Sequence, residues 1–223
     1  PVATSDTTSS GAEESEDYSD TADLYVPPAN VEAFIDQIAE SLVLIECAGS
    51  SGTGFAYEIS GLEEGYNTFI VTNHHVIEDC IGQEKYLTIA RAYKKAISAR
   101  IITMDKENDL AVLVSDLKVP PLKLAQSAPF PGYWVMTSGS ADAYQGSISF
   151  GTVLNVTDTE VLITANVSAG NSGGPLVDNE GNVIGTVSWS SKLEQYNGAM
   201  SLDAMCTKIL SCDGEYYWEY DSD

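Results

Sequence analysis

The chain has 223 residues, of which 43% are apolar, enough to bury the core of one sizeable domain. Its 33 acidic and 10 basic residues give a net charge of −23, so the composition argues against binding to nucleic acid or to an anionic membrane surface, because like charges repel. No apolar run is long enough to cross a bilayer, and we expect no membrane-spanning helix.

Both ends of the chain are acidic. Residues 1–30 are rich in Ser, Thr, Asp, Glu and Ala and contain no Lys or Arg, so they cannot bury enough apolar surface to offset their ordering. We predict that 1–30 is a disordered segment and that 213–223 is a second acidic tail. Solvation is the main interpretation of this charge, and a tether, a propeptide or a halophilic source are the alternatives. Because the chain begins without Met, we expect an upstream segment to have been removed or left out.

Residues 31–212 form one predicted domain. Val31–Glu40 carries apolar groups at helical spacing and is predicted as a short helix, His74–Cys80 as a helical turn and Asp203–Leu210 as a closing helix. Short apolar runs separated by turn residues predict the strands. In chain order these are Leu42–Cys47, Gly52–Ile59, Thr68–Thr72, Tyr86–Tyr93, Ala96–Met104, Leu110–Val114, Tyr133–Thr137, Ser147–Val156, Glu160–Ala165, Pro175–Val177, Val183–Trp189 and Gly198–Leu202.

About six strands fall in each half of this domain, and no long helix separates them. This pattern predicts an all-β fold of two six-stranded antiparallel β-barrels, at about 31–120 and 121–212, with a short N-terminal helix and a C-terminal helix. Pro120-Pro121 marks the boundary between the halves.

The four cysteines have no Cys-x-x-Cys spacing, so no zinc template fits them. An even number suits two disulfides in an oxidising compartment. Sequence alone leaves three connectivities open. We predict the pairs Cys47–Cys80 and Cys206–Cys212, with buried free thiols as the alternative.

The strongest chemical signal is the segment Gly170–Pro175, which reads Gly-Asn-Ser-Gly-Gly-Pro. A nucleophilic serine needs an exposed hydroxyl and backbone N–H groups aimed at the oxyanion that develops on the substrate. Flanking glycines allow the tight turn and the close approach that this requires. We therefore predict Ser172 as a nucleophile and the N–H groups of Gly170 and Ser172 as the oxyanion hole. A plain glycine-rich turn is the alternative.

The same residues also fit Gly-x-Ser-x-Gly, the nucleophile elbow of α/β-hydrolases. In those enzymes the histidine follows the serine, and a helix begins directly after the serine. Here the two histidines, His74 and His75, both precede Ser172, and Pro175–Val177 continues as a strand. The chain order argues against the α/β-hydrolase interpretation.

His74 and His75 follow an apolar strand. A serine hydroxyl is a poor nucleophile at neutral pH and needs a general base, a task that suits histidine. Adjacent residues usually point in different directions, and no third ligand accompanies the pair, so we expect no metal site there.

Asp109 stands directly before the apolar strand Leu110–Val114, and no other aspartate between the histidines and the serine has such a position. The acid of a triad must be held rigidly because it fixes the tautomer of the histidine. Asp109 is therefore the predicted acid. A calcium loop starting at Asp105 is rejected, because Leu110 occupies the position that requires glycine.

Four ordered segments resemble the chymotrypsin clan of serine proteases, most closely the bacterial trypsin-like enzymes and the protease domain of the HtrA family. These segments are Gly52–Phe55, Thr72–Val76, Asn108–Leu113 and Gly170–Leu176. The resemblance covers roughly residues 40–210, and four ordered motifs at sensible spacing make it far more specific than any one motif alone.

The resemblance implies a catalytic cleft between two barrels and peptide-bond hydrolysis through an acyl-enzyme, without a metal or an organic cofactor. The histidine directly before Val is the base in this family, which selects His75 over His74. Asn171 stands where zymogen-activated digestive enzymes have Asp, so activation by a freed N-terminus is not expected. No PDZ-like domain is expected after the last helix.

The resemblance also implies a substrate-binding strand and a specificity pocket. Ser188 is expected to hydrogen-bond Asp109. The pocket floor falls near Asn166, so the usual counter-charge for an Arg or Lys side chain is missing there, and Glu194 is the nearby acid that could restore it. Core packing is the alternative role for Trp189. The implied substrate-binding residues are Asn166, Ser188, Trp189 and Ser190.

The predicted function is that of a serine endopeptidase, secreted or at the cell surface, with protein or peptide substrates. A pseudo-protease that binds peptides without cleaving them is the main alternative. An esterase or acyltransferase with the same triad is a further one. The oligomeric state is left open.

Overall fold

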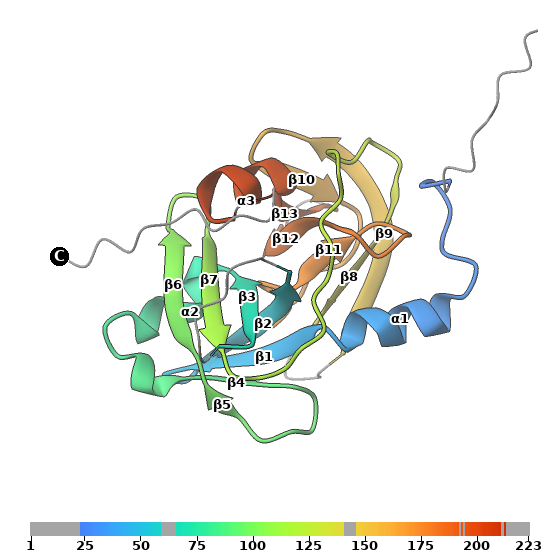
Figure 1. Cartoon of the computed structure of the whole chain (residues 1–223). Coiled ribbons are helices and arrows are strands. Elements are labelled where there is room, and N and C mark those ends of the chain that lie inside the picture. Colours follow the sequence, from blue (N-terminus) through green and yellow to red (C-terminus); the bar gives the residue numbers. More distant parts are fainter. Residues whose placement is uncertain are drawn as a thin grey trace, which may run out of the picture.

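The structure, a computed structural model, describes residues 23–58, 66–140, 146–191, 193, 195–210 and 212. Its strands form two antiparallel sheets that lie side by side, and short helices lie at the periphery (Figure 1). The blue-to-green N-terminal sheet is at the lower left of that view, and the yellow-to-orange sheet is at the upper right. The predicted acidic segments at 1–22 and 213–223 lie outside the described residues.

The N-terminal sheet has seven strands in the order β5-β4-β1-β2-β3-β7-β6 and thus differs from the predicted six-stranded barrel. The predicted strand Ala96–Met104 divides into two, because its first part pairs with β4 and its second part pairs with β7. Ala99, between the two parts, donates its N–H to Leu87 O at 3.2 Å. The strands are β1 (Leu42–Cys47), β2 (Ser50–Tyr57), β3 (Thr68–Thr72), β4 (Leu87–Ala90), β5 (Ile97–Ser98), β6 (Arg100–Asp105) and β7 (Leu110–Ser115).

The second sheet is a closed barrel of six strands in the order β10-β13-β12-β11-β8-β9, as predicted. Every strand of this barrel falls within two residues of its predicted bounds. The strands are β8 (Trp134–Gly139), β9 (Ser147–Val156), β10 (Glu160–Ile163), β11 (Pro175–Val177), β12 (Val183–Ser190) and β13 (Asn197–Ser201).

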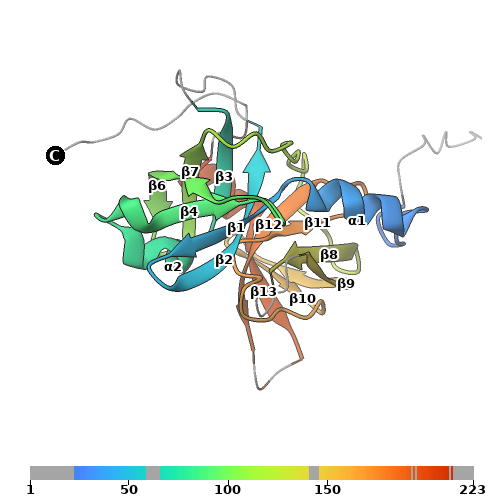
Figure 2. The same cartoon turned by 90° about the horizontal axis from the view of Figure 1, so that it is seen from below.

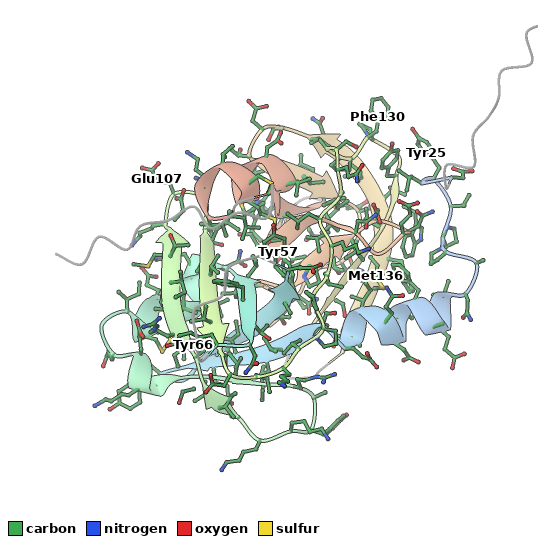
Figure 3. All side chains as sticks on the ribbon, viewed as in Figure 1. Tyr25, Tyr57, Tyr66, Glu107, Phe130 and Met136 are labelled. Carbon is green, nitrogen blue, oxygen red and sulfur yellow. A yellow bond between two sulfur atoms is a disulfide. The ribbon has the colours of Figure 1, made fainter. Side chains whose placement is uncertain are left out.

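Buried apolar side chains form one cluster inside each sheet and a third cluster between the sheets. Phe55 and Tyr57 on β2 belong to the third cluster, as do Trp134 and Met136 on β8. Figure 3 shows Tyr57 and Met136 in the middle of the molecule, where the two sheets meet. Burial of this shared surface holds the two halves in a fixed relation.

The helix α1 (Val31–Ala39) begins at Asn30, whose side-chain oxygen accepts a hydrogen bond from Ala33 N at 3.1 Å. Phe34 and Ile38, one turn apart, bury their side chains. In both views α1 lies near β8 (Figures 1 and 2), and the ring of Phe34 meets that of Trp134 edge-on at 5.8 Å. The remaining helices are α2 (His74–Ile77), α3 (Leu202–Lys208) and the 3-10 turns Glu78–Cys80 and Glu84–Tyr86.

Residues 23–30, which the sequence assigned to a disordered segment, pack on the barrel. Trp134 N donates to Leu24 O at 2.8 Å, and the side-chain amide of Asn179 donates to the carbonyls of Asp23 and Val26 at 2.7 and 2.8 Å. The predicted boundary at residue 30, between the disordered segment and the domain, is therefore too late. Residues 23–30 are ordered by aromatic contacts and by side-chain hydrogen-bond donors, and they have no apolar core of their own. Among the described residues, no helix is long and apolar enough to span a membrane.

Both predicted disulfides are present, Cys47–Cys80 and Cys206–Cys212, with Cα–Cα distances of 5.7 and 5.3 Å. The first joins β1 to the turn after α2, and both of its cysteines are fully buried. It therefore ties the segment that carries the histidines to the sheet.

Replacing Cys47 and Cys80 together by Ala should lower the free energy of unfolding by about 3–4 kcal/mol, because their loop spans 33 residues. The double replacement of Cys206 and Cys212, which are six residues apart, should cost about 1.5 kcal/mol less on the same loop-entropy argument. Urea unfolding of both double variants under oxidising conditions measures the difference. Equal losses would contradict the loop-entropy argument.

Candidate active site

The two histidines stand at the start of α2, directly after β3. Asn73 precedes them with an extended backbone (φ −88°, ψ 153°), so the chain turns sharply from strand into helix. His74 is buried at 5% exposure, whereas His75 is exposed and reaches Asp109. The structure therefore places His75, the histidine predicted as the base, beside the predicted acid.

Asp109 lies in the turn between β6 and β7 and has a left-handed backbone (φ +50°), which is rare for residues other than glycine. Asp105 shapes this turn, because its carboxylate accepts hydrogen bonds from the N–H groups of Glu107 and Asn108 at 2.9 and 3.0 Å. Asn73, fully buried, donates its side-chain amide to Asp109 O at 2.8 Å. The backbone of the acid is thus fixed from both sides.

The carboxylate of Asp109 accepts hydrogen bonds from three donors. His75 Nδ1 lies 2.8 Å from Oδ2 and 3.0 Å from Oδ1, and the backbone N–H of His75 donates to Oδ1 at 2.9 Å. Ser188 Oγ donates to Oδ2 at 2.6 Å, which is the contact that the family resemblance predicted. With Nδ1 as the donor to Asp109, the imidazole leaves Nε2 free to accept a proton.

Burial acts to raise the pKa of Asp109, but the hydrogen bonds from the His75 side chain, from Ser188 and from the His75 backbone outweigh it. The pKa of this carboxyl group therefore lies below its usual value. Ionised Asp109 stabilises the folded state above its ordinary pKa of about 3.9, and this contribution is lost as the pH falls through the lowered value.

Replacing Ser188 by Ala should raise the pKa of Asp109 and cost about 1.5–3 kcal/mol of unfolding free energy at neutral pH, the range for a hydrogen bond to a charged group. The cost should shrink once the pH is low enough to protonate Asp109 in both proteins. Ser115→Ala is the control, because Ser115 Oγ donates to the neutral carbonyl of Ser98. Urea unfolding at several pH values tests this, and a cost for Ser188→Ala that does not change with pH would contradict it.

Ser172 lies in the loop between β10 and β11. Asn171 N donates to Ser168 O at 3.0 Å and closes a turn over residues 168–171. Gly170, the third residue of this turn, has a left-handed backbone with φ +93°, as a type II turn requires. Among the described residues, the N–H groups of Gly170 and Ser172 have no hydrogen-bond acceptor. Both are therefore available to an oxyanion.

The serine loop is fastened to the N-terminal sheet through Thr53 on β2. Thr53 N donates to Ser172 O at 2.9 Å, and Thr53 Oγ1 donates to Gly170 O at 2.6 Å. The same hydroxyl accepts a hydrogen bond from Ser140 N at 2.9 Å. Gly173 (φ +83°) lies so close to Thr53 O and Thr72 Oγ1 that a Cβ atom there would overlap both.

In this structure the hydroxyl of Ser172 points to the carbonyl of Ser188, at 3.4 Å, and makes no hydrogen bond to His75 within the described residues. Ser172 is partly exposed, and its hydroxyl can adopt other staggered rotamers about the Cα–Cβ bond.

A pocket of about 680 Å³ lies next to this loop. It brings together the predicted residues Asn166 and Ser190, and none of its described lining residues is charged. Trp189 does not line it, because its indole turns over β13 and donates Nε1–H to Glu160 Oε1 at 2.8 Å. Glu194 lies outside the described residues. The pocket is lined by Thr164, Asn166, Val167, Ser190, Ser191, Gln195 and Asn197.

Two residues that support this site were given no role by the sequence alone. Asn73 and Thr53 both stand inside motifs of the resemblance, but their partners lie 36 and 117 residues away in the chain. No local pattern encodes such distant contacts. Within the described part of the chain, no group of three His, Cys, Asp or Glu side chains could hold a metal ion.

The sequence profile of the family described as "Trypsin-like peptidase domain" matches residues 52–185, more than half of the chain. The chain belongs to this family. Among curated proteins it is similar to the "Probable periplasmic serine endoprotease DegP-like" of Chlamydia trachomatis, with 34% identity over 145 residues, 60% of this chain and 27% of that protein. It is also similar to "Serine protease HTRA1B" of Danio rerio, with 31% identity over 183 residues, 75% of this chain and 36% of that one.

The chain therefore spans only about a quarter to a third of the length of these relatives. Among solved structures, the serine endoprotease from Yersinia pestis superposes with a TM-score of 0.70 at 23% identity, over 83% of this chain and 67% of that chain. The active form of the Rv3671c protease from M. tuberculosis gives a TM-score of 0.68 at 20% identity, over 87% and 91%. These superpositions show the shared fold.

Proposed function

We propose that this member of the trypsin-like peptidase family is a serine endopeptidase. The observation that carries the proposal is the convergence of three hydrogen-bond donors on the carboxylate of Asp109, two of them from His75. A carboxylate so held fixes the imidazole for one task, the removal and return of a proton. The names of the relatives, serine protease and serine endoprotease, are consistent with this.

The reaction proceeds through an acyl-enzyme. The Ser172 hydroxyl turns from the Ser188 carbonyl toward His75, gives its proton to Nε2 and attacks the carbonyl carbon of the peptide bond. The negative oxygen of the tetrahedral intermediate accepts hydrogen bonds from the N–H groups of Gly170 and Ser172. The C–N bond then breaks, and His75 gives its proton to the leaving amine. Water then gives a proton to His75 and attacks the ester carbonyl of the acyl-enzyme. The bond to Ser172 Oγ breaks, His75 returns the proton to that oxygen, and the second product leaves as a carboxylic acid.

Fluorophosphonate labelling tests this proposal, because the reagent bonds covalently to an activated serine. The wild-type chain should be labelled at Ser172 and should cleave an unfolded protein substrate, and Ser172→Ala should lose both reactions. Ser168→Ala, in the same loop but outside the proposed triad, is the control for specific labelling. Binding of peptides without labelling or cleavage would favour the pseudo-protease alternative, and cleavage of esters alone would favour an esterase.

The pocket next to the serine loop sets the proposed cleavage preference. Its described lining contains amide, hydroxyl and apolar groups but no carboxylate, so a buried Arg or Lys side chain would lack a counter-charge. We expect cleavage after uncharged residues. A peptide library read by mass spectrometry measures this preference, and predominant cleavage after Arg or Lys would contradict it.

We also infer that the chain acts outside the cytoplasm. Disulfides persist in oxidising compartments, and this chain has two, while one relative is named as periplasmic. Protein isolated from its native source and denatured without reductant should show no free thiols. Reduced cysteines in such a preparation would place the protein in a reducing compartment.

A further inference from the structure

The positive charge of this chain is concentrated in one stretch. Residues 85–104 contain five of the ten basic residues and no acidic residue. This stretch carries a charge of +5 and the remainder carries −28, which together give the net charge of −23. Arg91, Lys94 and Lys95 lie in the loop 91–96 between β4 and β5, which projects from the N-terminal sheet at the lower edge of the molecule (Figure 1). We call residues 91–96 the basic loop.

The cations of the basic loop are open to solvent. Lys94 and Lys95 are exposed, and Arg91 is partly exposed. Among the described residues, none of the three forms an ion pair. Glu46 on β1 lies opposite Thr88 on β4, and it forms no ion pair with these cations either. At physiological salt, charges more than about 8 Å away are largely screened, so an anionic group at this loop interacts mainly with its cations.

Tyr93 stands at the tip of the basic loop in a conformation that costs stability. Lys94 N donates to Arg91 O at 3.0 Å and closes a turn over residues 91–94. Tyr93, the third residue of this turn, has a φ of +58°, in the left-handed region that favours glycine. The residue is nevertheless a large aromatic one, and it is 95% exposed. A strained backbone is typical of functional sites, and exposed tyrosine is typical of surfaces that bind other proteins.

A short chain of contacts joins the basic loop to the serine loop. Ala92 lines a cavity of about 50 Å³ together with Ser140 and the start of β1. Ser140 N donates to Thr53 Oγ1 at 2.9 Å, and the same hydroxyl donates to Gly170 O in the serine loop at 2.6 Å. A long polypeptide bound at Ser172 can therefore contact the basic loop with a part of its chain that is distant from the cleaved bond.

We propose that the basic loop is a docking site for an acidic stretch of the protein substrate, outside the segment that is cleaved. Carboxylates of Asp or Glu pair with Arg91, Lys94 and Lys95, and the ring of Tyr93 packs against the bound chain. The negative charge of the remaining surface disfavours other positions for such a stretch, because like charges repel. The docked stretch thus orients the substrate. This inference rests on the proposed endopeptidase function and adds a substrate class to it.

The test uses peptides that share one cleavage segment and differ in a short tail, a run of Glu in one and of Gln in the other. Each tail is joined through a flexible linker, either before or after the cleavage segment. In one of these two arrangements, the wild-type chain should show a KM about threefold to tenfold lower for the Glu peptide, the range of two or three exposed ion pairs, with an unchanged kcat. Lys94→Gln together with Lys95→Gln should bring the two KM values within about twofold. High salt should do the same, because it screens exposed charges.

Tyr93→Gly separates binding from stability. Glycine relieves the left-handed strain, so this variant should unfold at a higher urea concentration than the wild-type chain. The loss of the ring should nevertheless raise the KM for the Glu peptide by about twofold or more. A more stable variant with an unchanged KM would overturn the part of the proposal that assigns Tyr93 to the docking site.

Lys118→Gln together with Lys123→Gln is the matched control, because both residues are exposed and the net charge changes equally. This variant should keep the wild-type difference between the peptides. If the wild-type chain is labelled at Ser172 but shows equal KM values for the Glu and Gln peptides, the docking site is wrong and the endopeptidase stands. Faster cleavage of both peptides by the Lys94 and Lys95 variant would show that the basic loop binds an acidic segment of the chain itself, and would also overturn the docking site. If the wild-type chain is neither labelled nor active, the endopeptidase proposal itself fails.

Discussion

Replacing Asp109 by Asn should lower kcat/KM for a peptide substrate by about 10⁴-fold while leaving the fold intact. The carboxylate receives three donors, and an amide offers one oxygen and one NH₂ group in their place. If the amide oxygen keeps the backbone N–H of His75, its NH₂ group faces Nδ1, which must then act as an acceptor. The proton moves to Nε2, and the imidazole can no longer take a proton from Ser172.

Steady-state kinetics of Asp109→Asn and of Asp116→Asn measure this effect. Asp116 is an exposed acid at the other end of β7, so its replacement makes the same change in charge and should leave kcat/KM within about twofold of wild type. Circular dichroism and urea unfolding show whether each variant is folded. A kcat/KM for folded Asp109→Asn within tenfold of wild type would show that Asp109 does not orient the base.

Replacing Gly173 by Ala should cost roughly 2–5 kcal/mol of unfolding free energy and abolish labelling of Ser172. The left-handed φ of +83° accounts for about 1–2 kcal/mol of this cost. The added methyl group overlaps Thr53 O and Thr72 Oγ1, and relief of that overlap by backbone movement accounts for about 1–3 kcal/mol more. Because Thr53 also holds Ser172 O, the movement displaces the nucleophile.

Gly82→Ala separates these two contributions. Gly82 has a similar φ of +73°, but a Cβ atom there would meet nothing within 4 Å. Its replacement should therefore cost only the backbone strain, about 1–2 kcal/mol, and should leave labelling of Ser172 unchanged. Urea unfolding of both variants gives the comparison, and equal costs at the two positions would show that the overlap at Gly173 is relieved without strain.

The elements that the sequence predicts well are those whose signal is local. The closed barrel follows from short apolar runs bounded by turn residues, and the placement of His75 and Asp109 follows from their positions at the ends of apolar strands. The split of β5 from β6 was missed, because the pairing of each part is decided by a different distant strand. The packing of residues 23–30 was missed for the same reason, since Trp134 and Asn179 are far away in the chain.

Within the site, the residues that act directly carry recognisable patterns, and the residues that hold them do not. The glycines on both sides of Ser172 predict its role, and the apolar strand that follows Asp109 predicts the role of that residue. Asn73, which fixes Asp109, and Thr53, which fixes the serine loop, make contacts that only the folded chain creates. The contact of Glu160 with Trp189 belongs to this second class, because the two residues lie on strands that β13 separates in the barrel.

The attachment of the serine loop to Thr53 and of Ser188 to Asp109 makes the catalytic alignment a property of the whole molecule. Each hydrogen bond crosses from one half to the other, so a slippage of a few ångströms between the halves breaks both. We expect a chain whose halves have not docked to contain every side chain of the proposed triad and to lack the alignment that the proposed reaction needs.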